Sequence, residues 1–266
     1  MLCATFSACS DDDGQELGNP APGAESLTIT ANGVSFVMVP VEGGTFTMGA
    51  AEGQSDAESN EQPAHQVTLS SYYIGQTTVT QALWQAVTGY SPTSDGSSWS
   101  SSYGLGDNYP AYYINYNDAR SFIDKLNSLT GRTFRMPTEA EWEYAARGGS
   151  KSEHYKYSGS NSINEVALYY SNSSRTVTVA QKAANELGLY DMSGNVGEWC
   201  SDWYGSYSSS AQTNPTGPST GSSRVLRGGC WRSDAAYCRV ATRNCNTPSI
   251  HSYSNGVRLA LSFSQK

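Results

Sequence analysis

Apolar and polar residues alternate along two neighbouring segments near the start of the chain. Residues 27–30 read Leu-Thr-Ile-Thr, and residues 34–39 are mostly apolar. Asn32-Gly33 lies between them, and this dipeptide is a strong short-range signal for a hairpin turn. We therefore predict two antiparallel strands, with Pro40 ending the second because proline lacks the N–H that a strand ladder uses.

Two later segments have the period of an amphipathic helix. Residues 80–88 form one, with Thr80 as its N-cap and Gly89 as its C-terminal stop. The other covers residues 117–129. One stripe of this helix carries its apolar side chains: Ala119, Phe122, Ile123, Leu126 and Leu129.

A third helix is predicted within residues 137–148. Thr138 and Glu141 have the spacing of a capping box, and Gly148 ends the helix. Short apolar runs predict strands at 43–49, 66–69 and 72–75. Composition rich in Gly, Ser, Asn and Tyr predicts loops at 86–110, 150–175 and 204–223. This order of elements is typical of the α+β class, and nothing within residues 27–266 marks a second domain.

Composition and net charge exclude several classes of function. The 266 residues carry a net charge of -8, with Lys+Arg 16 and Asp+Glu 24. This balance excludes phosphate-neutralising nucleic-acid binders and polybasic membrane-surface proteins. No apolar run reaches the roughly 18 residues of a membrane-spanning helix. The 18 Tyr, 6 Trp and 26 Gly instead suit a loop-rich protein, expected to be a monomer, with Tyr/Ser surfaces that bind at low entropic cost.

The first nine residues predict a targeting signal. Phe6-Ser7-Ala8-Cys9 resembles a bacterial lipobox, although the apolar stretch before it is short and carries no basic residue. We interpret residues 1–9 as the end of a lipoprotein signal peptide and Cys9 as the lipid attachment site; the alternative is a frayed tail. Residues 10–25, beginning Ser-Asp-Asp-Asp, are an acidic and polar tether of the kind that some surface lipoproteins carry. The domain then covers 26–266, displayed on the outer membrane.

Seven motifs in order resemble the formylglycine-generating-enzyme family, also called the sulfatase-modifying-factor domain. The motifs are Phe46-Thr-Met-Gly49, Glu61-Gln-Pro-Ala-His-Gln-Val67, Thr78-Val-Thr80, Arg135-Met-Pro-Thr-Glu-Ala-Glu-Trp-Glu-Tyr-Ala-Ala-Arg-Gly-Gly149, Gly188-Leu-Tyr-Asp-Met-Ser-Gly-Asn-Val-Gly-Glu-Trp199, Arg227-Gly-Gly229 and Gly256-Val-Arg-Leu259. The match runs from about residue 36 to 262. The resemblance implies a complex C-type-lectin-like fold with small twisted sheets, few helices and much ordered loop.

The family includes copper-dependent oxidases, and the resemblance places their two copper-binding cysteines at Ser233 and Cys238. A hydroxyl is a poor Cu(I) ligand, so this site is half missing, and Cys230 could replace Ser233 only after a register shift. The iron-dependent relatives need several clustered histidines, whereas His65, His154 and His251 are far apart in sequence. His65 belongs to the family's Pro-x-His motif and is expected to be structural. Neither copper nor iron is expected, and we expect no catalytic residue.

A calcium ion is the cofactor that the resemblance implies. Its ligands in the family correspond to Asp191, Gly194, Val196 and Glu198. Two carboxylates that bracket a glycine-containing turn offer the oxygen ligands that Ca²⁺ prefers. The alternative is that Asp191 and Glu198 cap turns or pair with Arg227.

The stretch from Arg224 to Ser262 mixes family framework residues with residues of varied character. This is similar to the variable region of proteins diversified by retroelements, in which a C-type-lectin-like frame carries scattered substitutions on one face. The alternative is an ordinary polar loop. We predict a ligand-binding face made by Trp231, Arg232, Ser233, Asp234, Tyr237, Thr242, Cys245, Ser249, Ile250, His251, Ser252 and Tyr253.

Four cysteines remain after Cys3 and Cys9 are assigned to the signal peptide: Cys200, Cys230, Cys238 and Cys245. They allow three pairings. If Cys230 and Cys245 are products of diversification, Cys200–Cys238 is the natural bridge; otherwise all four are buried thiols. We hypothesise a surface lipoprotein whose domain binds a protein or glycan without turnover. The alternative is a family oxidase that acts on a protein Cys or another thiol with bound Cu or Fe.

Overall fold

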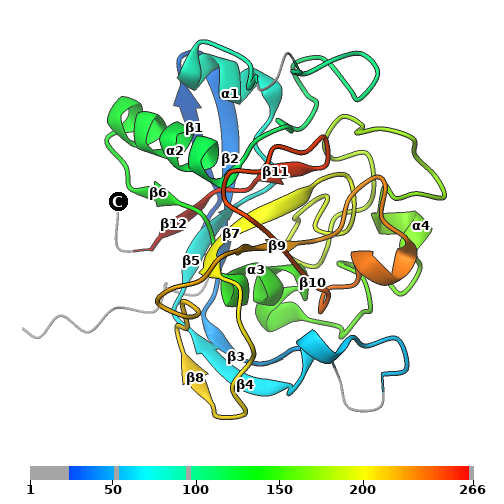
Figure 1. The fold of residues 1–266 in the computed structure, drawn as a ribbon. Coiled ribbons are helices and arrows are strands. Elements are labelled where there is room, and N and C mark those ends of the chain that lie inside the picture. The colour runs from blue at the N-terminus through cyan, green and yellow to red at the C-terminus, as the bar shows by residue number, and fades with distance from the viewer. Residues whose placement is uncertain (1–23, 51–53, 94–96, 264–266) are drawn as a thin grey trace, which may run out of the picture.

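Three small sheets hold the strands of the described residues (Figure 1). The structure, a computed structural model, describes residues 24–50, 54–93 and 97–263. The first sheet has the order β1-β2-β5-β12-β6, formed by Leu27–Ala31, Val34–Val41, Tyr72–Gly75, Ala260–Ser262 and Phe134–Arg135. The second has the order β10-β9-β7-β11, formed by Arg243–Asn246, Arg224–Arg227, Gly197–Trp203 and Asn255–Val257. The third has the order β3-β4-β8, formed by Gly44–Met48, His65–Leu69 and Gln212–Thr213.

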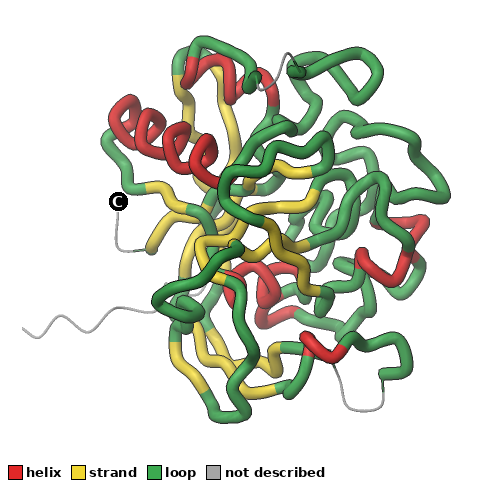
Figure 2. Tube along the Cα trace, viewed as in Figure 1, coloured by secondary structure: helices red, strands yellow, loops and turns green. Residues whose placement is uncertain are grey.

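Helices are short and loops are long in the described residues (Figure 2). The α-helices are α1 Gln81–Thr88, α2 Tyr116–Thr130, α3 Glu139–Ala146 and α4 Ile163–Val166. Single 3-10 turns lie at Ser59–Glu61, Gly149–Lys151 and Ala235–Cys238. The α+β class and the C-type-lectin-like architecture are confirmed. The predicted loop segments hold little regular structure: the end of α1, one turn of Gly149–Lys151, α4 and β8.

The predicted hairpin at Asn32-Gly33 is present. Both residues have positive φ, 44° and 84°, as a two-residue turn between twisted strands requires. The expectation that Pro40 ends the second strand was wrong, because β2 continues to Val41. β1 ends opposite Met38, so Pro40 has a strand neighbour on one side only, where its missing N–H is tolerated.

Helices α1 and α2 cover one face of the first sheet, and their ends follow the predicted caps (Figure 1). Thr80 accepts from the N–H of Leu83, and Gly89 takes the left-handed conformation that ends α1. The predicted stripe of α2 is buried except for Leu129, which is 48% exposed. Leu129 lies in the last turn of α2, beyond the reach of the core.

Helix α3 lies inside the molecule, against β7 and β9. Thr138 and Glu141 form the predicted capping box, and all eight helix residues are buried. Three of these residues are glutamates, and each is paired with arginine. Glu139 pairs with Arg243, Glu141 with Arg135, and Glu143 with both Arg147 and Arg227. A buried helix can carry these charges only because each is neutralised in place.

Candidate ligand-binding face

Buried arginines frame the C-terminal stretch. Arg227, Arg239, Arg243 and Arg258 are each at most 4% exposed. Between them the chain turns outward, and five members of the predicted face are exposed: Arg232, Asp234, Tyr237, Ser249 and Ile250. The structure therefore places these side chains at the surface while their flanking arginines stay inside.

The remaining members of the predicted face are less accessible. Six are half-buried: Trp231, Ser233, Cys245, His251, Ser252 and Tyr253. Thr242 is only 4% exposed, and its hydroxyl donates to the carbonyl of Ala236 at 3.0 Å. The prediction that Thr242 is an accessible contact residue is therefore wrong. Its side chain is buried because Thr242 belongs to the buried run of residues that leads into β10.

A cavity of about 340 Å³ opens within this face. Its glycine floor comes from the turn after β9, and its charged rim comes from Arg232 and Asp234. Tyr237, which is 45% exposed, stands beside it. The other lining residues are Leu226, Gly228, Gly229, Cys230, Ser233, Thr242, Asn244 and Ser254. The cavity thus offers both charge signs, hydroxyls and an aromatic ring.

An aromatic cluster adjoins the cavity. Tyr253 stacks on Tyr103 with ring centroids 4.0 Å apart and on Tyr113 at 4.7 Å. Trp231 donates its indole N–H to the carbonyl of Tyr253 at 3.1 Å and lies 6.0 Å from the ring of Tyr103. His251 contacts Asp118 through Nε2 at 2.8 Å. One end of the face is therefore held by side chains that precede it by more than 100 residues.

Tyr103, Tyr113 and Asp118 contact this face but are not among the residues predicted for it. The available signal was a density of tyrosines between residues 103 and 116. That signal shows aromatic surface, but it does not show which distant segment the rings support.

The one cysteine that the resemblance places at a copper position, Cys238, is buried. Burial raises the pKa of its thiol to about 12. The thiol therefore stays protonated at neutral pH, whereas the thiolate is the form that binds metals and reacts. Ser233 lies beside Cys230, with Oγ 3.2 Å from Sγ. The position that the resemblance assigns to the second copper-binding cysteine thus holds a hydroxyl next to Cys230.

The conditional bridge between Cys200 and Cys238 is not formed. All four described cysteines are free thiols. Cys200 packs in the core around Trp142, whereas Cys238 packs in a separate cluster with Tyr157 and Tyr169. The bridge fails because the two cysteines belong to different packing units.

The expected calcium ligands share one buried region, but Glu198 already has partners. Its carboxylate accepts from Thr78 Oγ1 at 2.7 Å, from Trp142 Nε1 at 2.6 Å and from Arg258 Nη2 at 2.8 Å. Asp191 is also buried, and desolvation raises its pKa to about 6, partly opposed by the N–H of Ala180 and by Arg258. As arranged, these groups do not fit a calcium ion, because the Arg258 guanidinium supplies the neutralising charge. The partner of Glu198 is thus Arg258 rather than Arg227.

Comparison with known proteins identifies the family. The model of the sulfatase-modifying factor enzyme 1-like domain matches residues 30–263. A formylglycine-generating enzyme from Streptomyces coelicolor is 31% identical, with 91% of this chain and 94% of that protein covered. The chain belongs to the sulfatase-modifying-factor family.

Other proteins similar to this chain carry different names. Chaperone protein LppX from Paenibacillus barcinonensis is 34% identical, covering 78% of this chain and 83% of that protein. Among solved structures, Treponema denticola variable protein 1 has a TM-score of 0.79 at 32% identity, covering 90% of this chain and all of that one. Membership in the family therefore does not decide between enzyme and binding protein. Within the described residues, no helix is long and apolar enough to cross a membrane.

Replacing Glu198 by Gln tests what the buried carboxylate does. The amide cannot neutralise Arg258, so we expect a loss of about 3–5 kcal/mol in the free energy of unfolding. Denaturant unfolding is measured in EDTA and in CaCl₂, and we expect the same loss in both. Glu25→Gln, at an exposed position, is the matched control and should stay within about 0.5 kcal/mol. Wild-type stability that rises with calcium and no longer does so in E198Q would instead establish Glu198 as an ion ligand.

Proposed function

We propose that this protein is a lipid-anchored surface protein whose sulfatase-modifying-factor domain binds a protein or glycan ligand through the C-terminal face without turnover. The observation that carries the proposal is the contrast along residues 224–262. Four arginines of this stretch, Arg227, Arg239, Arg243 and Arg258, are buried and paired, whereas the exposed side chains between them have little contact with the core. These exposed side chains can therefore contact a ligand without disturbing the core.

The chemistry of the face supports binding. Tyr237 and Trp231 supply flat contact area with few rotatable bonds, and the neighbouring serines supply adaptable hydrogen bonds. Arg232 and Asp234 at the cavity rim offer both charges to a ligand that carries polar groups. Cys238 remains a protonated buried thiol, which supports recognition rather than oxidation as the role of this region.

Replacement of Tyr237 by Ala tests the face. Because the ring is 45% exposed, we expect stability to change by at most about 0.5 kcal/mol. Binding to the ligands found on glycan and protein arrays with the wild-type chain should fall at least about tenfold, as for an aromatic anchor. Tyr90→Ala removes a ring of similar exposure, 52%, outside the face and should leave binding intact. A ligand that binds Y237A and R232A as tightly as the wild type would contradict the placement.

The same preparations provide a control for turnover. Reduced protein is supplied with Cu(I) and a sulfatase-motif peptide, and the peptide is followed by mass spectrometry. We expect the peptide Cys to remain unchanged. Conversion of that Cys to formylglycine, lost in Cys238→Ala, would show that the oxidase alternative is correct.

Anchoring rests on Cys9, which lies outside the described residues. We expect an alkyne-tagged fatty acid to label the chain in cells, and Cys9→Ala to abolish the label. Cys3→Ala is the matched control and should keep it, since Cys3 is assigned to the removed peptide. Protease added to intact cells should degrade the labelled protein if it is displayed outside the outer membrane. An unlabelled wild-type chain would exclude the anchor.

Diversification of the face is the remaining part of the proposal. The similarity to a Treponema protein named as variable supports it. We expect the source genome to carry, near this gene, a reverse-transcriptase gene and a near-copy of the 230–258 coding stretch that differs only at adenines. Without these two features, the face would be an ordinary inherited binding surface.

A further inference from the structure

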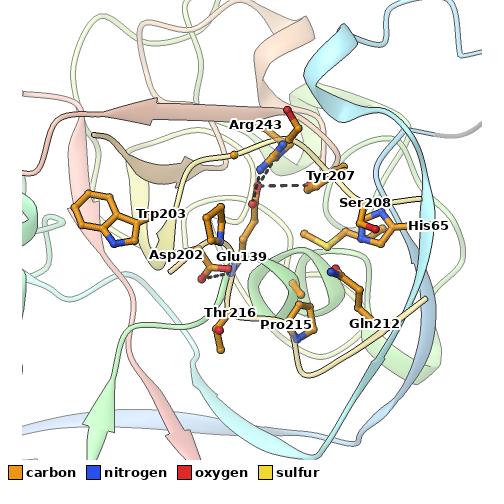
Figure 3. A pocket seen from close by; sticks show the side chains of 16 residues that line it. His65, Glu139, Asp202, Trp203, Tyr207, Ser208, Gln212, Pro215, Thr216 and Arg243 are labelled. Atoms are coloured by element: carbon orange, nitrogen blue, oxygen red, sulfur yellow. Dashed lines mark hydrogen bonds and ion pairs between the residues drawn. The ribbon is translucent and has the colours of Figure 1, made fainter. Parts of the chain in front are cut away.

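A second cavity, of about 350 Å³, lies between β3, β4, the start of α3 and the loop after β7 (Figure 3). It shares no lining residue with the cavity of the C-terminal face. Arg243 contributes to this second cavity, whereas its neighbours Thr242 and Asn244 line the first. The two cavities therefore lie on opposite sides of the chain at the start of β10, as alternating residues of a strand do.

The buried donors of this second cavity are already engaged. Arg243 donates through Nε and Nη2 to the two oxygens of Glu139 at 2.6 and 2.7 Å, and through Nη1 to the carbonyl of Asn60 at 2.9 Å. Tyr207 points its hydroxyl at Glu139 Oε1, 3.4 Å away. Glu139 is therefore neutralised, and neither Arg243 nor Tyr207 needs a ligand.

Two buried acceptors are not engaged. Asp202, 4% exposed, uses Oδ2 to accept from the N–H of Glu139 at 3.0 Å and from Ser201 Oγ at 2.9 Å. No donor in the described part of the chain reaches Oδ1. His65, also 4% exposed, has Nδ1 3.1 Å from the carbonyl of Pro63. A carbonyl only accepts, so in the neutral imidazole Nδ1 carries the proton and Nε2 presents a lone pair, for which the described residues supply no partner.

The two acceptors lie on opposite sides of Glu139 in Figure 3. Met48, Trp203, Pro215 and Pro218 line the cavity together with the polar side chains of Ser206, Ser208, Gln212 and Thr216. One face of the Trp203 ring is already covered by Arg224, whose guanidinium carbon lies 3.5 Å from the ring centroid. Asp202 and His65 thus offer buried hydrogen-bond acceptors in a lining that is partly apolar and partly polar.

Electrostatics adds a preference for a cation. Burial, together with the nearby carboxylates of Glu139 and Glu141, raises the pKa of Asp202 to about 7, partly opposed by the hydrogen bonds from Glu139 and Ser201. Arg135, Arg224, Tyr116 and Cys200 are the other titratable groups that interact with it. No arginine or lysine of the described chain forms an ion pair with Asp202. A ligand that brings its own positive charge would supply the missing partner.

We propose that this cavity binds a primary ammonium group on an alkyl stem, as in a lysine side chain, with the ammonium on Asp202 Oδ1 and the stem along Pro215 and Pro218. An ammonium is a compact charge with three donors, which suits one free carboxylate oxygen. A guanidinium prefers to pair with both oxygens of a carboxylate, and Oδ2 is taken. This site is separate from the C-terminal face and does not depend on the function proposed for it.

The probes are Nα-acetyl-lysine amide, its uncharged counterpart Nα-acetyl-norleucine amide and Nα-acetyl-arginine amide, titrated into the full chain by NMR and calorimetry. We expect the lysine probe to bind at least about tenfold more tightly than either other probe. Its Kd should fall about tenfold per pH unit from pH 5 to pH 6 and level off above about pH 7, because only ionised Asp202 pairs with the cation. Equal binding of the norleucine probe would overturn the proposal.

Asp202→Asn is the decisive variant, since the amide oxygen can keep the bonds from Glu139 and Ser201 while the amide NH₂ faces the cavity. We expect at least about a tenfold loss of lysine-probe affinity and a much flatter pH profile. Asp234→Asn removes the same charge from the other cavity and should leave the affinity unchanged. Calorimetry on the wild type in buffers of different ionisation enthalpy gives an independent readout: binding at pH 6 should release nearly one proton. Absence of proton release, or unchanged affinity in D202N, would overturn the proposal.

Discussion

Buried pairs between arginine and glutamate hold the C-terminal stretch to the rest of the fold. Arg227 pairs with Glu143, Arg239 with Glu61, Arg243 with Glu139 and Arg258 with Glu198. The partners of these pairs are 60 to 178 residues apart in sequence. Removal of one partner leaves a buried charge, at a cost of about 3–5 kcal/mol. The pairs therefore determine where each segment between them begins and ends.

This arrangement separates the frame from the surface. Gly229 shows how tight the frame is: a Cβ there would lie 2.6 Å from the carbonyl of Tyr237 and 2.9 Å from Cys238 Sγ, and its φ is +70°. A few residues further on, Arg232 and Asp234 are exposed and carry no such restriction. Changes at exposed positions alter what the molecule presents, while the glycines and arginines preserve how it folds.

Local structure could be predicted from the sequence because its causes are local. Thr80, Asn32-Gly33 and the pair of Thr138 and Glu141 act on neighbouring backbone, and each took the predicted role. Long-range partners were not predictable in the same way. The sequence shows that Glu198 is a carboxylate, but only the fold shows that Arg258 lies against it. Likewise, only the fold shows that Arg243 neutralises Glu139 and that Asp202 Oδ1 has no partner in the described residues.

The pairing of the last strands, β11 and β12, affects how fast the chain folds. β12 lies between β5 and β6, and β11 pairs with β7, so residues 255–262 complete two sheets. The second strand that pairs with β5 is β12, almost 190 residues later in the sequence. Such high contact order makes folding slow, because the ends of a long loop must meet before the pairing stabilises anything. The two sheets can therefore be completed only once the last strands of the chain are available.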